Sequence, residues 1–253
     1  MLLNYFFAPR DEATYPPCGM FTLPHFIALF ITLALVAVGF YFFRNDTRER
    51  LKNKTKIVAI VVTVLEGVKI GYNFAYDYTW PDAWIPLAFC SLFIYASWLA
   101  GFGKGIFEKL GVGFMIGGSP TAGLLFLIFP TTSLQMHPIY HYLCLYSMLF
   151  HGLMLLFGLL YVFRSGYKLD LKTFGYYAAI CVIFAIPALI LNGVLGCNMM
   201  FLREPFNVPI AFIGMIHDFS QVLYTVLIFL AYLACYLVSW GVSKLKPQRS
   251  KDE

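Results

Sequence analysis

The chain has few charged residues: Asp, Glu, Lys and Arg make up 12% of its 253 residues, whereas 60% are hydrophobic. A soluble domain of this length needs far more polar surface, while lipid accepts apolar surface around the whole belt of a protein. The composition therefore excludes an ordinary soluble domain. It predicts a single all-α membrane domain over residues 1–253.

Other features are missing too. The six cysteines form no CxxC pair and no zinc-like spacing, so we expect neither a metal nor another cofactor. A Cys18–Cys197 disulfide remains open and requires both loops to face an oxidising compartment. The N-terminus lacks the basic start and cleavage site of a signal peptide, so it is expected to stay in the mature chain. The last apolar run has no lysine, which excludes a retinal Schiff base.

Apolar runs of about 20 residues, the length that crosses a bilayer, recur along the sequence. They predict a bundle of seven transmembrane helices. The expected spans are 24–43, 57–76, 84–102, 112–129, 139–163, 174–195 and 216–242. The motif GGSP at 117–120 interrupts the fourth, and the long apolar loop 196–214 has the character of a re-entrant segment.

The basic residues predict the orientation. Residues 44–56, 103–111, 164–173 and 243–253 together hold 15 of the 18 lysines and arginines. These are alternate connections plus the C-terminus, so the positive-inside rule predicts a cytoplasmic C-terminus and an outer N-terminus. Topology thus accounts for the formal charge of +5, which is no indication of nucleic-acid binding.

Polar residues inside the spans gather in the outer half of the membrane. Glu66, Lys69 and Asn73 form one stripe on the second span. Further outer-half residues are His141 and His151 on the fifth span, Asn192 and Asn198 near the end of the sixth, Asp218 at the start of the last, and Cys90 in the third. Buried ions are costly, so these groups should face one another in a polar cavity. The alternative for Glu66 and Lys69 is an ion pair that only fixes packing.

The histidines allow more than one interpretation. His141 and His151 are about 15 Å apart along a helix, which is too far to share one metal ion. Each is either an ordinary hydrogen-bonded histidine or a proton-transfer group.

A set of landmarks resembles the YwaF-like integral membrane proteins of bacteria, which are related to transmembrane protein 164 of animals. The landmarks are His25; Trp84, Pro86, Leu87 and Cys90; Phe129, Pro130, His151 and Gly152; and Asn192, Gly196, Asn198, Phe201, Leu202 and Pro205. Their order and spacing cover most of the chain. The segment around the cysteine reads IPLAFC, with Ala88 where this family often has histidine.

The resemblance implies an acyltransferase or transacylase of a bacterial cytoplasmic membrane that moves a fatty acyl chain between phospholipids. Cys90 would be the nucleophile and His151 the base. Depth alone does not choose the base, because Cys90 lies about 10 Å below the outer end, between His141 at about 3 Å and His151 at about 18 Å. Asn192, Asn198 and Lys69 would donate to an oxyanion, and Glu66 or Asp218 would orient a histidine.

Two other classes of function fit the same residues. A small-solute transporter or binding protein would use the broken fourth span and the re-entrant loop around its substrate. A membrane scaffold would use the polar groups for packing alone. The sequence does not predict an oligomeric state.

Overall fold

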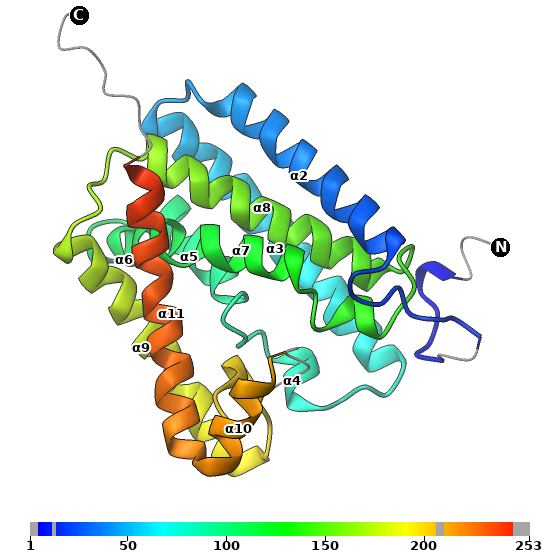
Figure 1. The fold of residues 1–253 in the computed structure, drawn as a ribbon. Coiled ribbons are helices and arrows are strands. Elements are labelled where there is room, and N and C mark those ends of the chain that lie inside the picture. The colour runs from blue at the N-terminus through cyan, green and yellow to red at the C-terminus, as the bar shows by residue number, and fades with distance from the viewer. Residues whose placement is uncertain (1–4, 12–13, 206–209, 245–253) are drawn as a thin grey trace, which may run out of the picture.

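The computed structural model describes residues 5–11, 14–205 and 210–244, and these form helices and no strand (Figure 1). The long helices are α2 (Leu23–Phe43), α3 (Arg48–Ala75), α8 (Tyr142–Arg164), α9 (Leu171–Leu195) and α11 (Gln221–Ser243). The shorter ones are α4 (Pro81–Trp84), α5 (Leu92–Phe102), α6 (Ile106–Gly117), α7 (Ser119–Ile128), η1 (Ser133–Gln135), η2 (Met199–Phe201) and α10 (Ala211–Phe219).

In the described part of the chain, six helical stretches are long and apolar enough to cross a membrane. They are α2, α3, the stretch Ile106–Gln135, α8, α9 and α11. The expectation of an all-helical integral membrane protein is therefore confirmed. The second span differs from its prediction because α3 begins at Arg48, where Thr47 accepts a hydrogen bond from the Arg50 N–H as N-cap. Most of the basic loop 44–56 is thus helix.

The third predicted span, 84–102, is not one helix. After α4 the chain runs through a non-helical segment, residues 85–91, before α5 begins. Pro86 accounts for the break, because it keeps Ile85 extended at φ −83°, ψ 114° and lacks an N–H donor. The 11 residues of α5 measure only about 16 Å, roughly half of a hydrocarbon core. Segment 85–91 is covered by protein, with Leu87 and Phe89 both buried.

The fourth span is broken at Gly118, as its sequence predicts, and its glycines permit close helix packing. A Cβ at Gly111 would lie 2.4 Å from the Ala100 nitrogen of α5, and one at Gly117 would lie 2.7 Å from the Tyr177 ring of α9. A Cβ at Gly123 would meet the backbone of α8. The α6–α7 stretch is therefore in contact with three neighbours, as small residues allow in membranes.

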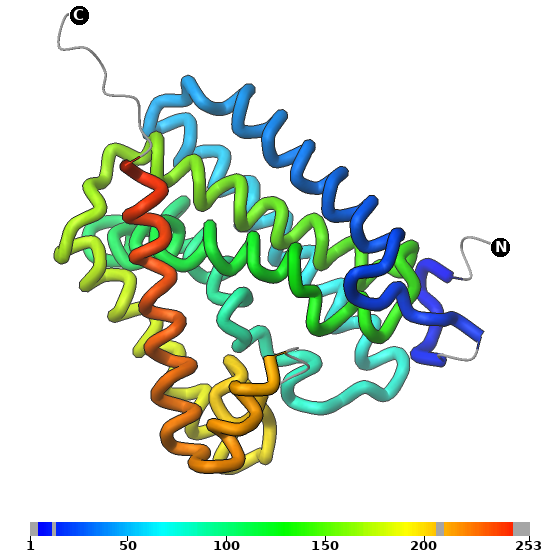
Figure 2. The backbone as a smooth tube through the Cα atoms, in the orientation of Figure 1, coloured from blue at the N-terminus to red at the C-terminus, as the bar shows by residue number. Residues whose placement is uncertain are grey.

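The helices form two groups that diverge from α6 (Figure 2). In one group, α2, α3 and α7 all contact α8; in the other, α9 and α11 contact each other and α6. Segment 85–91 and α4 lie between the groups (Figure 1). The Phe89 ring stacks on Tyr232 of α11 at 4.0 Å, and Asn73 Nδ2 of α3 donates to the Ala83 carbonyl.

The last predicted span and its preceding loop also differ in detail. Helix α11 starts at Gln221 instead of 216, because Ser220 is extended and accepts from the Leu223 N–H as N-cap. The start of loop 196–214 folds back along α11, where the Tyr232 hydroxyl donates to the Met200 carbonyl at 2.5 Å. Met200 is 1% exposed. Residues 206–209 of this loop lie outside the described residues.

Cys18 and Cys197 are not bridged, and all six cysteines are thiols. Cys18 belongs instead to an N-terminal segment that covers one end of α3 and α8. Its N–H donates to the His137 carbonyl at 2.9 Å, while the Tyr72 hydroxyl donates to the Ala8 carbonyl at 2.7 Å.

Candidate functional site

A buried ion pair on α3 is hydrogen-bonded to α8 inside the bundle. Lys69 Nζ lies 2.5 Å from Glu66 Oε1, and the hydroxyl of Tyr146 donates to Glu66 Oε2, also at 2.5 Å. Glu66 is 5% exposed. The phenol compensates Oε2 by a hydrogen bond, whereas Oε1 is balanced by the charge of the ammonium and accepts no hydrogen bond among the described residues. The pair thus combines the i,i+3 contact expected from sequence with a bond between two helices.

Cys90 lies beside this cluster. The residue is half-buried, and its thiol interacts electrostatically with Lys69, Glu66 and Tyr146, and with Tyr232 on α11. It belongs to the turn that opens α5, and the backbone N–H groups of Cys90 and Ser91 are directed at the sulfur. Helix N-termini and ammonium groups both attract a thiolate. These interactions place Cys90 next to Glu66 and Lys69 in the structure.

His151 occupies a different face of α8. Its Nδ1 is 2.8 Å from the Ser147 carbonyl, and its ring stacks on Phe126 of α7 at 3.6 Å. A carbonyl only accepts, so Nδ1 carries the proton and Nε2 holds a lone pair. Nε2 is buried and has no hydrogen-bond partner among the described residues. The residues that contact the His151 ring lie on α7 and α8. Cys90 lies next to Tyr146, which is on a different face of α8.

His141 has both ring nitrogens engaged. Nδ1 accepts from the Leu143 N–H at 3.1 Å as the N-cap of α8, so Nε2 carries the proton and donates to the Ala8 carbonyl at 3.1 Å. Its ring stacks on His137 at 4.0 Å. Burial lowers the pKa of His141, and burial, with smaller effects of His141 and Arg10, lowers that of His137 to about 3. Both are neutral imidazoles. His141 holds the N-terminal segment through its ring, and His137 holds it through its backbone carbonyl.

Asn192 and Asn198 hold the irregular backbone that follows α9. Asn192 accepts from the Met199 N–H at 2.6 Å and donates to the Met199 carbonyl at 3.0 Å. The Asn198 side chain bonds to the backbone of Arg203 and Glu204, and its own N–H donates to Asp82 of α4. These contacts fix the turn that packs against Tyr232.

Asp218 stands apart from these residues. It lies on α10 with its side chain 83% exposed, 3.5 Å from His217 Nδ1. The predicted site residues therefore divide into a Cys90–Glu66–Lys69 cluster, loop-holding asparagines, and histidines on other faces. No group of three or more His, Cys, Asp or Glu that could hold a metal exists in the described part of the chain.

Sequence reasoning missed two tyrosines of this region. Tyr146 bonds to Glu66, and Tyr232 joins Phe89 to Met200. The one signal was that a hydroxyl on an apolar helix needs a buried partner, and the second oxygen of the Glu66 carboxylate on a neighbouring helix was available.

Comparison with known proteins identifies the family. The profile of the TMEM164 family matches residues 20–238, a range that includes Glu66, Cys90 and His151. No curated protein and no solved structure matches the chain. Because the match covers most of the sequence, the chain belongs to the TMEM164 family of membrane proteins.

Proposed function

We propose that the chain is a cysteine-dependent acyltransferase that moves a fatty acyl chain between phospholipids, with Cys90 as nucleophile. The observation that carries the proposal is the position of Cys90: a half-buried residue at the opening turn of α5, with its thiol in electrostatic range of Lys69. The other cysteines are buried. The Lys69 ammonium and the start of a helix favour the thiolate form of Cys90, whereas burial and the Glu66 carboxylate act against it.

The reaction has two steps. A base takes the proton of the Cys90 thiol, and the thiolate attacks an ester carbonyl of the donor phospholipid. The ester C–O bond breaks, and the departing lysophospholipid alkoxide takes the proton back from the base. A hydroxyl of the acceptor lysophospholipid then attacks the thioester, gives up its proton to a base, and regenerates the thiolate. The backbone N–H groups of Cys90 and Ser91, together with Lys69, are suited to stabilise the oxyanion.

His151 is the proposed base, as the resemblance implies, although its ring packs on α7 and α8 and does not contact Cys90. Its support is the Nε2 lone pair, which is buried without a partner while Nδ1–H is fixed by the Ser147 carbonyl. That tautomer accepts a proton at Nε2. His151→Gln should slow thioester turnover more than His141→Gln, because His141 caps α8.

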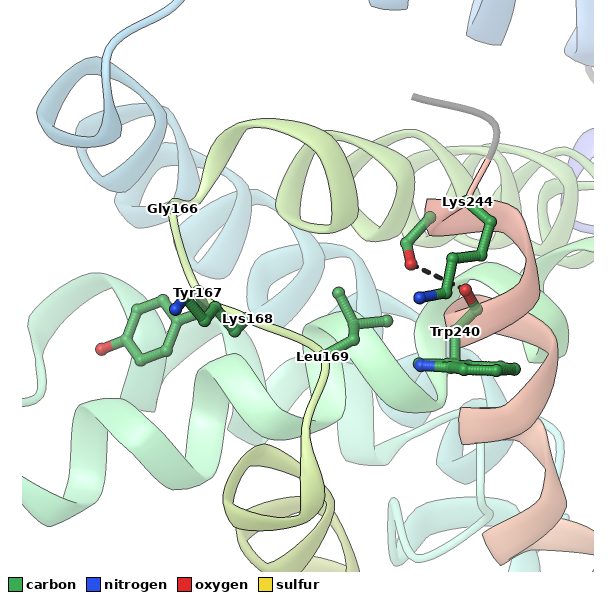
Figure 3. Close-up of a pocket in the computed structure, with 7 residues that line it drawn as sticks. Gly166, Tyr167, Lys168, Leu169, Trp240 and Lys244 are labelled. Atoms are coloured by element: carbon green, nitrogen blue, oxygen red, sulfur yellow. Dashed lines mark hydrogen bonds between the residues drawn. The ribbon is translucent and has the colours of Figure 1, made fainter. Parts of the chain in front are cut away.

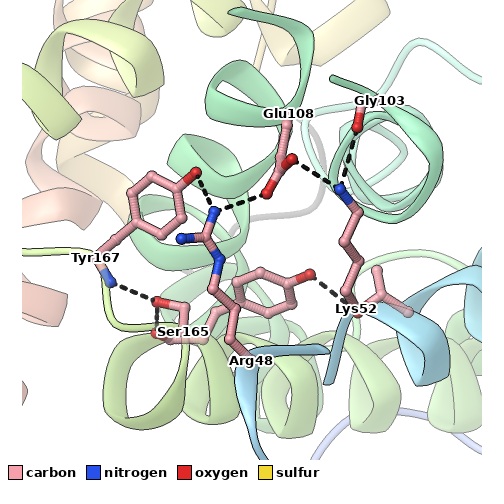
Figure 4. Close-up of polar contacts among 8 residues, drawn as sticks. Arg48, Lys52, Gly103, Glu108, Ser165 and Tyr167 are labelled. Atoms are coloured by element: carbon pink, nitrogen blue, oxygen red, sulfur yellow. Dashed lines mark hydrogen bonds and ion pairs between the residues drawn. The ribbon is translucent and has the colours of Figure 1, made fainter. Parts of the chain in front are cut away.

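The proposal includes seven membrane crossings in a bacterial cytoplasmic membrane, with the N-terminus outside. The third crossing would consist of segment 85–91 and α5. In support, residues of the alternate basic connections lie at one end: Arg48 bonds to Glu108 and Tyr167, and Lys52 Nζ donates to the Gly103 carbonyl (Figure 4). A C-terminal tag should be protected from protease in intact cells, and digestion there would contradict the topology.

The test compares Cys90→Ala with Cys181→Ala, which removes a fully buried thiol from α9. Wild type and Cys181→Ala should form an acyl thioester that hydroxylamine cleaves, and Cys90→Ala should not. The acyl composition of lysophospholipid-fed membranes should change in the same way. Equal labelling of all three proteins would refute the nucleophile.

A transporter or small-solute binding protein is the second candidate. It is favoured by two segments outside the α-helices, 85–91 and 197–202, that meet at Tyr232 inside the bundle. Such broken segments form substrate sites in transporters. Solute uptake that survives Cys90→Ala, with no thioester in wild type, would favour this function.

A further inference from the structure

Two hollows flank the linker between α8 and α9, at the end of the bundle where α3 and α6 begin. The first, of 290 Å³, lies between residues 166–169 and the last turn of α11, where Trp240 and Lys244 line it (Figure 3). The second, of 260 Å³, lies between the same linker, Arg48 and the first turns of α6 and α9. Both are small for a drug-sized ligand and suit a compact polar group.

The second hollow has an excess of positive charge. Its cations are Arg48, Lys109, Lys168 and Lys172. Asp170 is the carboxylate in its lining, and it accepts from the Thr173 N–H at 2.9 Å as the N-cap of α9. That hydrogen bond lowers the pKa of Asp170, so the residue is ionised and already engaged.

Glu108 does not neutralise the excess positive charge of the second hollow. It lies 2.9 Å from Arg48 Nη2 and 2.7 Å from Lys52 Nζ, so one carboxylate serves two cations (Figure 4). Neither Lys109 nor Lys172 has an ion-pair partner within the described ranges. Like charges crowded around one hollow repel each other unless an anion enters.

Apolar residues beside the hollows place them at a membrane surface. Leu171 is 87% exposed and Trp240 46% exposed, and Lys244 Nζ lies 4.7 Å from the Trp240 ring centre. Tryptophan and lysine occupy the headgroup level of membrane proteins. An anion bound here therefore sits where lipid headgroups are.

We propose that the hollow lined by Arg48, Lys109, Lys168 and Lys172 binds the phosphate group of an anionic phospholipid. The guanidinium and the three ammonium groups would contact the phosphate oxygens, and Leu171 would contact the acyl chains. This site is independent of the proposed acyl transfer, because it lies at the end of α3 opposite Asn73.

The experiment measures lipid binding to the purified full chain in detergent by native mass spectrometry. Phosphatidylglycerol is compared with phosphatidylcholine of the same acyl chains, in wild type and in the double variant Lys168→Gln/Lys172→Gln. Both lysines are exposed, so the fold should persist. Phosphatidylglycerol should bind more tightly than phosphatidylcholine. The double variant should bind phosphatidylglycerol about 25-fold more weakly than wild type, about fivefold for each lysine removed. Its affinity for phosphatidylcholine should be unchanged.

Lys104→Gln is the matched control, since Lys104 is an exposed lysine at the same end outside the hollow. Its phosphatidylglycerol affinity should equal that of wild type. Equal affinity of both lipids for wild type, or an equal loss in the control, would overturn the proposal. Displacement of the lipid by millimolar inorganic phosphate, with the same sensitivity to the double variant, would assign the hollow to a soluble anion and overturn the lipid assignment.

Discussion

The hydroxyl of Tyr146 on α8 donates a 2.5 Å hydrogen bond to Glu66 Oε2 on α3, next to the Lys69 ammonium that holds the other carboxylate oxygen. This contact gives the buried ion pair a function in the fold, because it joins two helices across the bundle. It also sets the electrostatic surroundings of Cys90, which lies within range of all three groups.

Tyr146→Phe removes this bond and leaves Glu66 Oε2 buried without a donor. We expect a loss of about 1–3 kcal/mol of stability, since an unsatisfied buried acceptor costs its desolvation energy. Thermal unfolding in detergent measures the change. Tyr140→Phe is the control, because Tyr140 is 61% exposed. Equal melting temperatures for the two variants would show that the contact contributes nothing.

The membrane class and most helix positions could be predicted because they depend on local hydropathy. The third span could not. Residues 84–102 read as one apolar run, yet Pro86 turns its first part into buried non-helical backbone. What keeps that backbone inside the bundle is tertiary: Phe89 stacks on Tyr232, which comes 143 positions later in the sequence.

In the candidate site, too, local properties could be predicted and tertiary contacts could not. The alignment of Glu66 and Lys69 could be expected from helix phase, a local property, whereas Cys90 was placed near them by its depth alone. The use of Asn192 and Asn198 did not follow, since an amide that binds a ligand and one that holds a loop look identical in sequence. Only the course of residues 197–204 decides between them.

Gly123→Ala tests the close packing of α7 on α8. A Cβ there would lie 2.8 Å from the Leu155 nitrogen and 2.9 Å from the His151 carbonyl oxygen, and neither backbone atom can move alone. We expect a destabilisation of about 1–3 kcal/mol. Gly175→Ala is the matched control, because a Cβ on this glycine of α9 meets nothing within 4 Å. It should stabilise by about 0.5–1 kcal/mol through helix propensity. Identical melting temperatures for both variants would contradict this packing.

Asn192→Ala tests how the turn at η2 is held. The variant loses two hydrogen bonds to the Met199 backbone, each worth about 0.5–1.5 kcal/mol. Amide hydrogen exchange in residues 197–202 should accelerate while α8 is unchanged. Asn53→Ala, which affects only an exposed contact with Lys56, should leave both regions as in wild type. Unchanged exchange at 197–202 in Asn192→Ala would mean that the turn is held by the hydroxyls of Tyr224 and Tyr232, which donate to the Phe201 and Met200 carbonyls.

His137 makes stability depend on pH. Burial first, then the neighbouring His141 and Arg10, lowers its pKa from the ordinary 6.5 to about 3, and burial lowers that of His141 as well. Between these two pH values the unfolded chain binds protons that the folded chain does not, so stability falls as the pH drops below 6.5. The Tyr72 ring packs edge-on against both histidines. Because its phenol is uncharged below pH 6.5, it does not stabilise a protonated histidine in the folded chain. The melting temperature should therefore decrease from pH 7 to pH 4.5, and His137→Phe should reduce the slope. An equally steep slope in the variant would assign the effect to other groups.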